Sequence, residues 1–234
     1  MFGTERILPL WPSLIRSPVL TQFAWSPLVE EGVQKNMHFL LPPRNTPIPP
    51  NFPLLPANDQ YAPIPGLLAL HIRRGDYAEH CRGFITYGST WMGFNTFPSF
   101  QDRFPPSSEE WAGLNATALY FKHCFPTIEQ IVEKVMDVKK TSIGKDLRNV
   151  YILTNGAREW VAELKDALRQ AAKWDKVTSS RDILLNKEQK YIAQAIDMMI
   201  AHKAQVFIGN GVRFVALFLI CRIDAIRCEC SSHP

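Results

Sequence analysis

The chain has 234 residues, of which 46% are hydrophobic and 21% charged, and its formal net charge is +4 at pH 7. These proportions are typical of one large globular domain or two small ones, and the slight basic excess without a long basic run favours an anionic small ligand over a nucleic acid. The longest apolar stretch, residues 206–221, is interrupted by Asn210 and Arg213, so no transmembrane segment is expected, and residues 1–20 carry charges and prolines that do not fit a signal peptide.

The amino-terminal part is expected to be an arm followed by a proline-rich linker. Residues 41–65 contain nine prolines, which exclude a regular helix or a central strand over that stretch. The arm ahead of them is too apolar to be left in water, so it must pack against another surface. Its apolar residues are Trp11, Leu14, Ile15, Val19, Leu20, Phe23 and Trp25.

An apolar run at residues 67–72 ends in two arginines, a glycine and an aspartate. Such a run, bounded by Pro65-Gly66 and Gly75, predicts a buried strand of a parallel sheet. Its charged end is then the carboxyl edge, where open α/β sheets bind ligands. Because side chains alternate across a strand, His71 and Arg73 are expected to share one face, while Ile72 and Arg74 share the other.

The charged end of this strand is suited to hold an anion. A guanidinium can bind a phosphate or a carboxylate through paired hydrogen bonds, and Gly75 lets the chain turn away without a side chain in the site. An alternative is a surface ion-pair cluster of Arg73, Arg74 and Asp76, which would add little stability. The residue types leave both open. An exposed adhesion signal at Arg74-Gly75-Asp76 is disfavoured, because the tripeptide follows a buried strand directly.

The next stretch, residues 77–111, is rich in Gly, Ser, Phe and Pro and predicts long irregular loops, which commonly form a site beside a strand end.

The chain has five cysteines, none at the Cys-x-x-Cys spacing of a zinc or redox site. Cys81 and Cys124 could form a disulfide, but the odd count leaves the compartment open. Asn115-Ala-Thr117 is a glycosylation acceptor if the chain enters the secretory route.

Helices and strands alternate through the rest of the chain. The apolar spacing predicts helices that start near Pro126, contain residues 160–168 and span residues 188–203, and strands at residues 149–154, 176–179 and 205–209. The last helix is expected to turn one set of residues inward, namely Tyr191, Ile192, Ala195, Ile196 and Met199.

This alternation predicts right-handed crossovers and a parallel, Rossmann-like α/β sheet. The expected boundaries are residues 1–65 for the arm and linker, residues 66–211 for the Rossmann-like domain and residues 212–234 for an atypical tail. Turns rich in Gly and Asn follow three of the strands, and the carboxyl edge would gather them in one crevice, although each alone also fits a simple tight turn. Since no dinucleotide-binding or P-loop glycine motif is present, a basic side chain must neutralise any bound phosphate.

The body of the chain resembles the carboxyl-terminal, donor-binding domain of the GDP-fucose protein O-fucosyltransferase superfamily, in a form similar to fungal members. The resemblance rests on residues 71–76, 150–155 and 194–210 and runs from about residue 2 to residue 211. It implies one half of a GT-B glycosyltransferase that transfers fucose with inversion from GDP-fucose to a protein Ser or Thr hydroxyl or to a glycan. It also implies a secretory location, GDP-fucose or GDP as the ligand, and no cofactor or metal.

The resemblance also implies roles for individual residues. Arg73 corresponds to the arginine that holds the β-phosphate, where it would stabilise the charge that develops on the departing diphosphate without a metal. His71 is expected to touch the nucleotide or to orient the strand end, although a core histidine fits it nearly as well. Asp182 and Asp197 are weaker candidates for contacts to the base or the ribose, although a helix residue satisfied by a neighbour fits Asp197 better. The further candidates for donor binding are Arg74, Gly75, Asp182 and Asn210.

Two departures from the family pattern argue for a second hypothesis. The family places a Ser-Ser or Ser-Thr pair after the last strand, at a helix amino terminus that binds phosphate. Here residues 212–217 have no hydroxyl, and Arg213 is the only basic side chain among them that could substitute. Most of the acceptor domain that the family implies also lies outside this sequence. The chain is therefore expected to be a fragment of a fucosyltransferase, with an inactive nucleotide-sugar or carbohydrate-binding remnant as the alternative.

Overall fold

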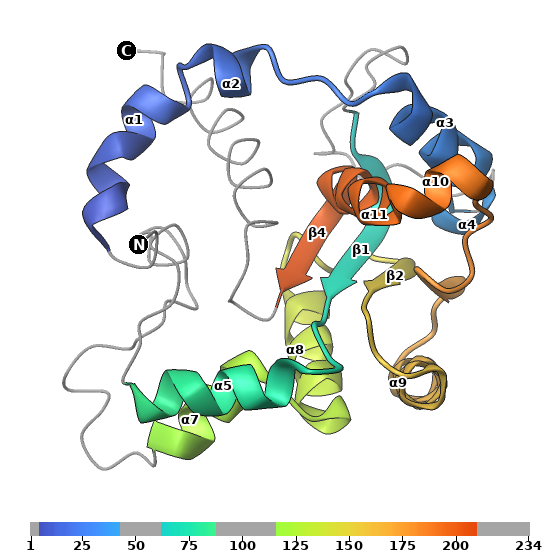
Figure 1. Ribbon diagram of the computed structural model, residues 1–234. Helices are drawn as coiled ribbons and strands as arrows, with labels where there is room; N and C mark the ends of the chain where they lie inside the picture. Colours follow the sequence, from blue (N-terminus) through green and yellow to red (C-terminus); the bar gives the residue numbers. More distant parts are fainter. Residues whose placement is uncertain (1–4, 43–61, 88–115, 210–234) are drawn as a thin grey trace. The chain divides into compact units, whose positions relative to one another are not determined.

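The computed structural model describes residues 5–42, 62–87 and 116–209 (Figure 1). The chain divides into two compact units. One unit consists of residues 25–75 and 126–209 and contains the sheet, and the other contains the described residues of 1–24 and 76–125.

Four parallel strands form the sheet, in the order β3-β2-β1-β4. This order confirms the predicted Rossmann-like α/β architecture. The chain passes from β1 to β2 and β3 on one side and then returns to β4 on the other side, so the topological switch point lies between β1 and β4 (Figure 1). The strands are β1 (Ile64–His71), β2 (Asn149–Leu153), β3 (Lys176–Ser179) and β4 (Ala204–Gly209).

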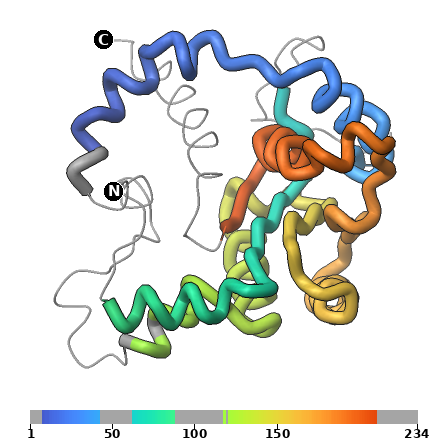
Figure 2. The backbone as a smooth tube through the Cα atoms, in the orientation of Figure 1, coloured from blue at the N-terminus to red at the C-terminus, as the bar shows by residue number. Residues whose placement is uncertain are grey.

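Helices cover both faces of this sheet. On one face, α8 (Ile128–Lys140) and α9 (Arg158–Ala171) enclose the main hydrophobic core. On the other face, α11 (Ala193–His202) packs on β1, with α3 (Pro27–Lys35) beside α11. Figure 2 follows the chain through these helices. The core under α8 and α9 contains Leu68, Leu70, Ile72, Ile131, Val135, Val150, Ile152, Leu164, Leu168 and Val177.

The helix predicted near Pro126 is confirmed and begins at Ile128. Thr127 caps it, because its hydroxyl accepts a hydrogen bond from the Gln130 backbone N–H (3.3 Å), while the Gln130 side chain accepts one from the Thr127 N–H (3.0 Å). This reciprocal pair satisfies two backbone donors that the first helical turn leaves without a partner.

The helix predicted over residues 188–203 is instead two helices, α10 (Lys187–Tyr191) and α11, which are separated by Ile192. Because Ile192 leaves the helical conformation (φ −114°, ψ 19°), the apolar stripe changes direction between the two helices. The expectation that Tyr191 faces inward is therefore wrong, since Tyr191 is 84% exposed. Ile196 and Met199, in α11, are buried as expected.

The proline-rich linker was predicted to extend through Pro65, but β1 already begins at Ile64. The strand tolerates Pro65 because its register is irregular at this point, between Ile64 and Leu68. Gly66 adopts a positive φ of 74°, and its N–H donates to the side-chain oxygen of Gln205 in β4 (2.7 Å) instead of to a backbone carbonyl. A side chain thus replaces a backbone partner that the irregular register removes.

Part of the predicted amino-terminal arm packs in the same unit as the sheet. Asn36, between α3 and α4 (Met37–Leu40), donates to the Leu184 carbonyl (3.0 Å) and accepts from the Leu184 N–H (2.7 Å). In the other unit lie a short 3₁₀ helix (Glu5–Leu10), α1 (Trp11–Leu14) and α2 (Pro18–Thr21). Trp11 is buried, whereas Val19 is 72% exposed, so the arm's apolar residues are only partly covered.

The expectation of irregular loops from residue 77 onward is wrong for its first ten residues, which form α5 (Tyr77–Thr86). Tyr77, Cys81 and Phe84 lie on one helical stripe, which the intervening polar residues and Gly83 obscure in the sequence. A disulfide joins Cys81 to Cys124 in α7 (Ala116–Cys124) and confirms the pairing that the sequence left open. The remainder of the predicted loop region, residues 88–111, and Asn115 lie outside the described residues.

Loss of this disulfide is expected to lower the free energy of unfolding by about 2–4 kcal/mol, because a cross-link over 43 positions restricts the unfolded chain. Thermal unfolding of the full chain with and without a reductant measures the effect. The double variant Cys81→Ser, Cys124→Ser is the control and should show the lower midpoint in both conditions. Equal midpoints for the oxidised wild type and the double variant would contradict this expectation.

Among the helices in the described ranges, none is both long enough and apolar enough to cross a membrane.

Candidate functional site

The carboxyl end of β1 lies between two strands. His71, the last residue of β1, is in register with Leu153 of β2 and with Gly209 of β4. The strand end is therefore at the switch point, where open α/β sheets bind ligands. Arg73 follows two residues later and, like His71, is partly buried. Asn210, the next residue after β4 and a predicted donor contact, lies outside the described residues.

The segment after β1, residues 72–75, is held by the end of β2, and we call it the arginine loop. The Ile72 N–H donates to the Leu153 carbonyl (3.0 Å), which continues the strand pairing by one residue. The Thr154 hydroxyl donates to the Ile72 carbonyl (2.5 Å), and the Arg74 N–H donates to the Asn155 side-chain oxygen (2.8 Å). These bonds fix the backbone on both sides of Arg73.

Gly75 has to be glycine for two reasons. Its φ is +63°, a conformation that other residues adopt only with strain. In addition, a Cβ at this position would lie 2.9 Å from the Asn155 side-chain nitrogen. Gly75 was expected to let the chain turn without an obstructing side chain, and the side chain that a Cβ would meet there is Asn155.

Arg74 is buried, with only 7% of its surface exposed. Its guanidinium lies 4.3 Å from the centre of the Trp160 ring and donates to the Pro126 carbonyl. Burial lowers the pKa of Arg74 to about 10, so the side chain remains charged at neutral pH. The Arg74 guanidinium is thus committed to the side of the sheet that α8 and α9 cover, where it anchors the arginine loop.

The position of Arg74 agrees with the alternation expected from the sequence. Leu68, Leu70 and Ile72 belong to the core under α8 and α9, and Arg74 continues the same side. Alternation then predicts that His71 and Arg73 lie on the opposite side of the sheet. The helix α11 packs against β1 on that side. Alternation thus accounts for the position of Arg74, and the side of Arg73 stays a prediction.

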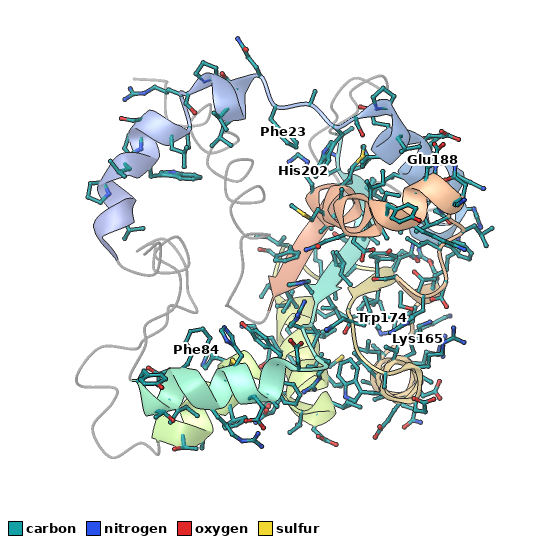
Figure 3. The ribbon with its side chains drawn as sticks, in the orientation of Figure 1. Phe23, Phe84, Lys165, Trp174, Glu188 and His202 are labelled. Atoms are coloured by element: carbon teal, nitrogen blue, oxygen red, sulfur yellow. A yellow bond between two sulfur atoms is a disulfide. The ribbon has the colours of Figure 1, made fainter. Side chains whose placement is uncertain are left out.

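Asp182 is occupied by contacts within the turn that follows β3. Its carboxylate accepts hydrogen bonds from Lys165 Nζ (2.5 Å), the Ser179 N–H (2.7 Å) and the Ser179 hydroxyl (3.0 Å). Figure 3 labels Lys165, which lies on α9. Burial opposes ionisation, but these hydrogen bonds and the lysine charge outweigh it and lower the pKa of Asp182. The structure therefore gives Asp182 a role in shaping the turn.

Asp197 of α11 is satisfied by its neighbours, as expected. The Tyr151 hydroxyl donates to Asp197 at 2.6 Å and the Ser180 hydroxyl at 2.9 Å. The Ser180 oxygen also lies within hydrogen-bond distance of the Thr154 N–H (3.4 Å), so this network reaches the residue that holds the arginine loop. Burial raises the pKa of Asp197 to about 6, and burial with the nearby Asp197 charge raises the pKa of Tyr151.

The raised pKa of Asp197 predicts a pH dependence of stability. Because the folded pKa (about 6) exceeds the usual 3.8, the contribution of Asp197 is fully present below about pH 4 and is lost as the pH rises through 6. Asp197→Asn should preserve both hydrogen bonds without this titration. The free energy of unfolding of the wild type minus that of Asp197→Asn should therefore fall by about 2–3 kcal/mol between about pH 4 and 7. Urea unfolding of both proteins measures it, and parallel pH curves would contradict it.

Three residues of this site had no role in the sequence analysis beyond a turn or a helix face. They are Thr154, Asn155 and Trp160, and each acts on a residue about 80 positions away. The only local signal was the polar Thr-Asn-Gly turn at the end of a buried strand. Among the described residues, no group of three or more His, Cys, Asp or Glu side chains is arranged to hold a metal ion.

Comparison with known proteins identifies the family. No curated protein matches this chain. Residues 24–215 match the family model described as GDP-fucose protein O-fucosyltransferase. This range includes all four strands, the arginine loop and the residues of β2 that hold it. The match confirms the resemblance to this superfamily and supports a fucosyltransferase-like role. The chain therefore belongs to the GDP-fucose protein O-fucosyltransferase family.

Proposed function

We propose that this chain is the donor-binding half of an inverting fucosyltransferase, and that it binds GDP-fucose at the carboxyl ends of β1 and β4. The acceptor is a protein Ser or Thr hydroxyl or a glycan. The observation that carries the proposal is the position of Arg73, on a loop at the topological switch point whose backbone Thr154 and Asn155 fix. A preorganised cation at that edge fits a diphosphate.

In this proposal Arg73 binds the β-phosphate through paired hydrogen bonds. As the acceptor hydroxyl oxygen bonds to the anomeric carbon of fucose from the opposite face and gives up its proton to water, the bond from that carbon to the diphosphate oxygen breaks. The electron pair stays on the phosphate, where Arg73 stabilises the added negative charge. Arg73 supplies this positive charge itself, so we propose no metal cofactor.

The other residues have supporting roles. His71 shares the side of Arg73 and contacts the nucleotide, and Asn210 contacts the donor from the end of β4. Arg74 is a positioning residue, because its guanidinium is bound to Pro126 and Trp160. Gly75 allows the turn beside Asn155.

Binding and transfer assays with the full chain test this function. Calorimetry should show GDP binding at least about tenfold tighter than GMP, since only GDP has the β-phosphate. Incubation with GDP-fucose and acceptor peptides or glycans should release GDP and yield a fucosylated product of inverted configuration. Equal affinities for GDP and GMP would contradict the assignment of Arg73.

A second candidate function is nucleotide-sugar binding without transfer. It is favoured by the sequence after β4, which has no Ser or Thr between Asn210 and Cys230 to bind phosphate oxygens. This candidate predicts GDP binding that depends on Arg73, with no fucose leaving GDP-fucose in the presence of any acceptor tested.

We also propose that the protein works in the secretory pathway. Support comes from the Cys81–Cys124 disulfide, since disulfides persist in oxidising compartments. The acceptor triplet at Asn115 offers a test. Expression in eukaryotic cells should give a protein whose mobility shifts on treatment with an endoglycosidase, and Asn115→Gln should abolish the shift.

A further inference from the structure

A basic hollow lies near the carboxyl end of β3, within the unit that contains the sheet. Its volume is about 610 Å³. Four cationic side chains line it, from α3, the start of α9, the turn after β3, and α10: Lys35, Arg158, Arg181 and Lys190. The other lining residues are Ser180, Ile183, Leu184 and Leu185. No acidic residue is among those that line it.

Among the residues that the structure describes, no carboxylate forms an ion pair with any of the four cations of the basic hollow. All four residues are exposed. Arg181 donates to the Gly156 carbonyl (2.7 Å), which holds its guanidinium in place but leaves its charge uncompensated. Like charges gathered around one hollow produce a positive potential that attracts acidic ligands.

The apolar part of the basic hollow limits the kind of ligand that fits. Leu184 is 55% exposed and adds apolar surface to the hollow, while Asn36 bonds to both its backbone N–H and its carbonyl. The hollow is open, so it cannot enclose a small molecule as typical small-ligand pockets do. Each exposed ion pair contributes only about 0–1 kcal/mol, so a ligand must engage several cations and the leucines together.

We infer that the basic hollow docks an acidic polypeptide segment in which carboxylates accompany leucine-like side chains. Such a segment can meet all four cations and cover Leu184 at the same time. This inference does not depend on the proposed donor site. The hollow is at β3, two strands and roughly 10 Å from β1, whereas the donor site is at the switch point between β1 and β4.

Fluorescence anisotropy with the full chain tests the inference. The probe is a fluorescein-labelled peptide of Glu, Asp and Leu residues, and the control peptide has Gln and Asn in place of the acids. The acidic peptide should bind, and its affinity should fall with rising salt. The variant Lys35→Glu, Arg158→Glu should bind it about tenfold or more weakly, since two attractions become repulsions. Leu184→Ala should weaken binding at both low and high salt.

A matched variant separates the local effect from the net charge. Lys145→Glu, Lys173→Glu changes the charge by the same amount on exposed lysines that do not line the hollow, and it should bind the acidic peptide like the wild type. Equal affinity in the two double variants, or equal binding of the acidic and neutral peptides, would overturn the inference. Displacement of the peptide by GDP or inorganic phosphate would also overturn it and assign the hollow to a phosphate ligand. GDP calorimetry on the same variants reports on the donor site separately.

Discussion

Replacement of Arg73 by alanine is expected to weaken GDP binding by about ten- to a hundredfold. The reason is that Arg73 would lose paired, charge-assisted hydrogen bonds to the β-phosphate, which are worth about 1.5–3 kcal/mol in total. Calorimetric titration of GDP into the wild-type chain and into Arg73→Ala measures the effect. Since the arginine loop is held through its backbone by Thr154 and Asn155, the loop should keep its conformation when the Arg73 side chain is removed.

Two comparisons make the Arg73 result specific. Arg73→Lys keeps the charge but loses the planar fork, so its GDP affinity should lie between those of the wild type and Arg73→Ala. GMP lacks the β-phosphate, so its affinity should differ little among the three proteins, which also controls for loss of folded protein. If Arg73→Ala bound GDP like the wild type, the donor site would have to be elsewhere.

Replacement of Arg74 by alanine should act on stability, with a loss of about 2–3 kcal/mol in the free energy of unfolding. The substitution removes a buried cation from the Trp160 ring and leaves the Pro126 carbonyl without this donor. Urea unfolding measures the loss. Arg74→Ala should weaken GDP binding only indirectly, to the extent that the arginine loop becomes less ordered.

Arg74→Met is the matched control for Arg74. Methionine fills much of the same space against Trp160 without the cost of burying a charge. Arg74→Met should therefore lose clearly less stability than Arg74→Ala. The adjacent variant Arg73→Ala gives a second comparison, and its main effect should be on GDP affinity. If the two arginines exchanged these effects, with Arg74 needed for GDP and Arg73 for stability, the assignment of their roles would be reversed.

The sequence predicted the elements that depend on local periodicity. The apolar run before His71, the strand at residues 149–153 and the helix that follows Thr127 are all present. Alternation along β1 also predicted the side of the sheet on which Arg74 lies. These predictions succeeded because burial on one or both faces of an element imposes a repeat that short segments display.

Local patterns failed where the tertiary structure changed the environment of a segment. The helix beginning at Tyr77 and the strand that includes Pro65 both have partners from other parts of the chain. In the case of Pro65, the side chain of Gln205 supplies the hydrogen bond that makes the irregular strand possible. No pattern within residues 60–70 contains that information.

The sequence by itself thus determined the sheet, its charged edge and the face on which Arg74 starts. Only the tertiary structure decided what surrounds Arg74, because Pro126, Asn155 and Trp160 are 52 to 86 positions away from Arg74 and meet it only in the folded chain. The physical reason is that periodicity fixes the direction of a side chain, whereas its charge state and its function depend on the groups within hydrogen-bond distance.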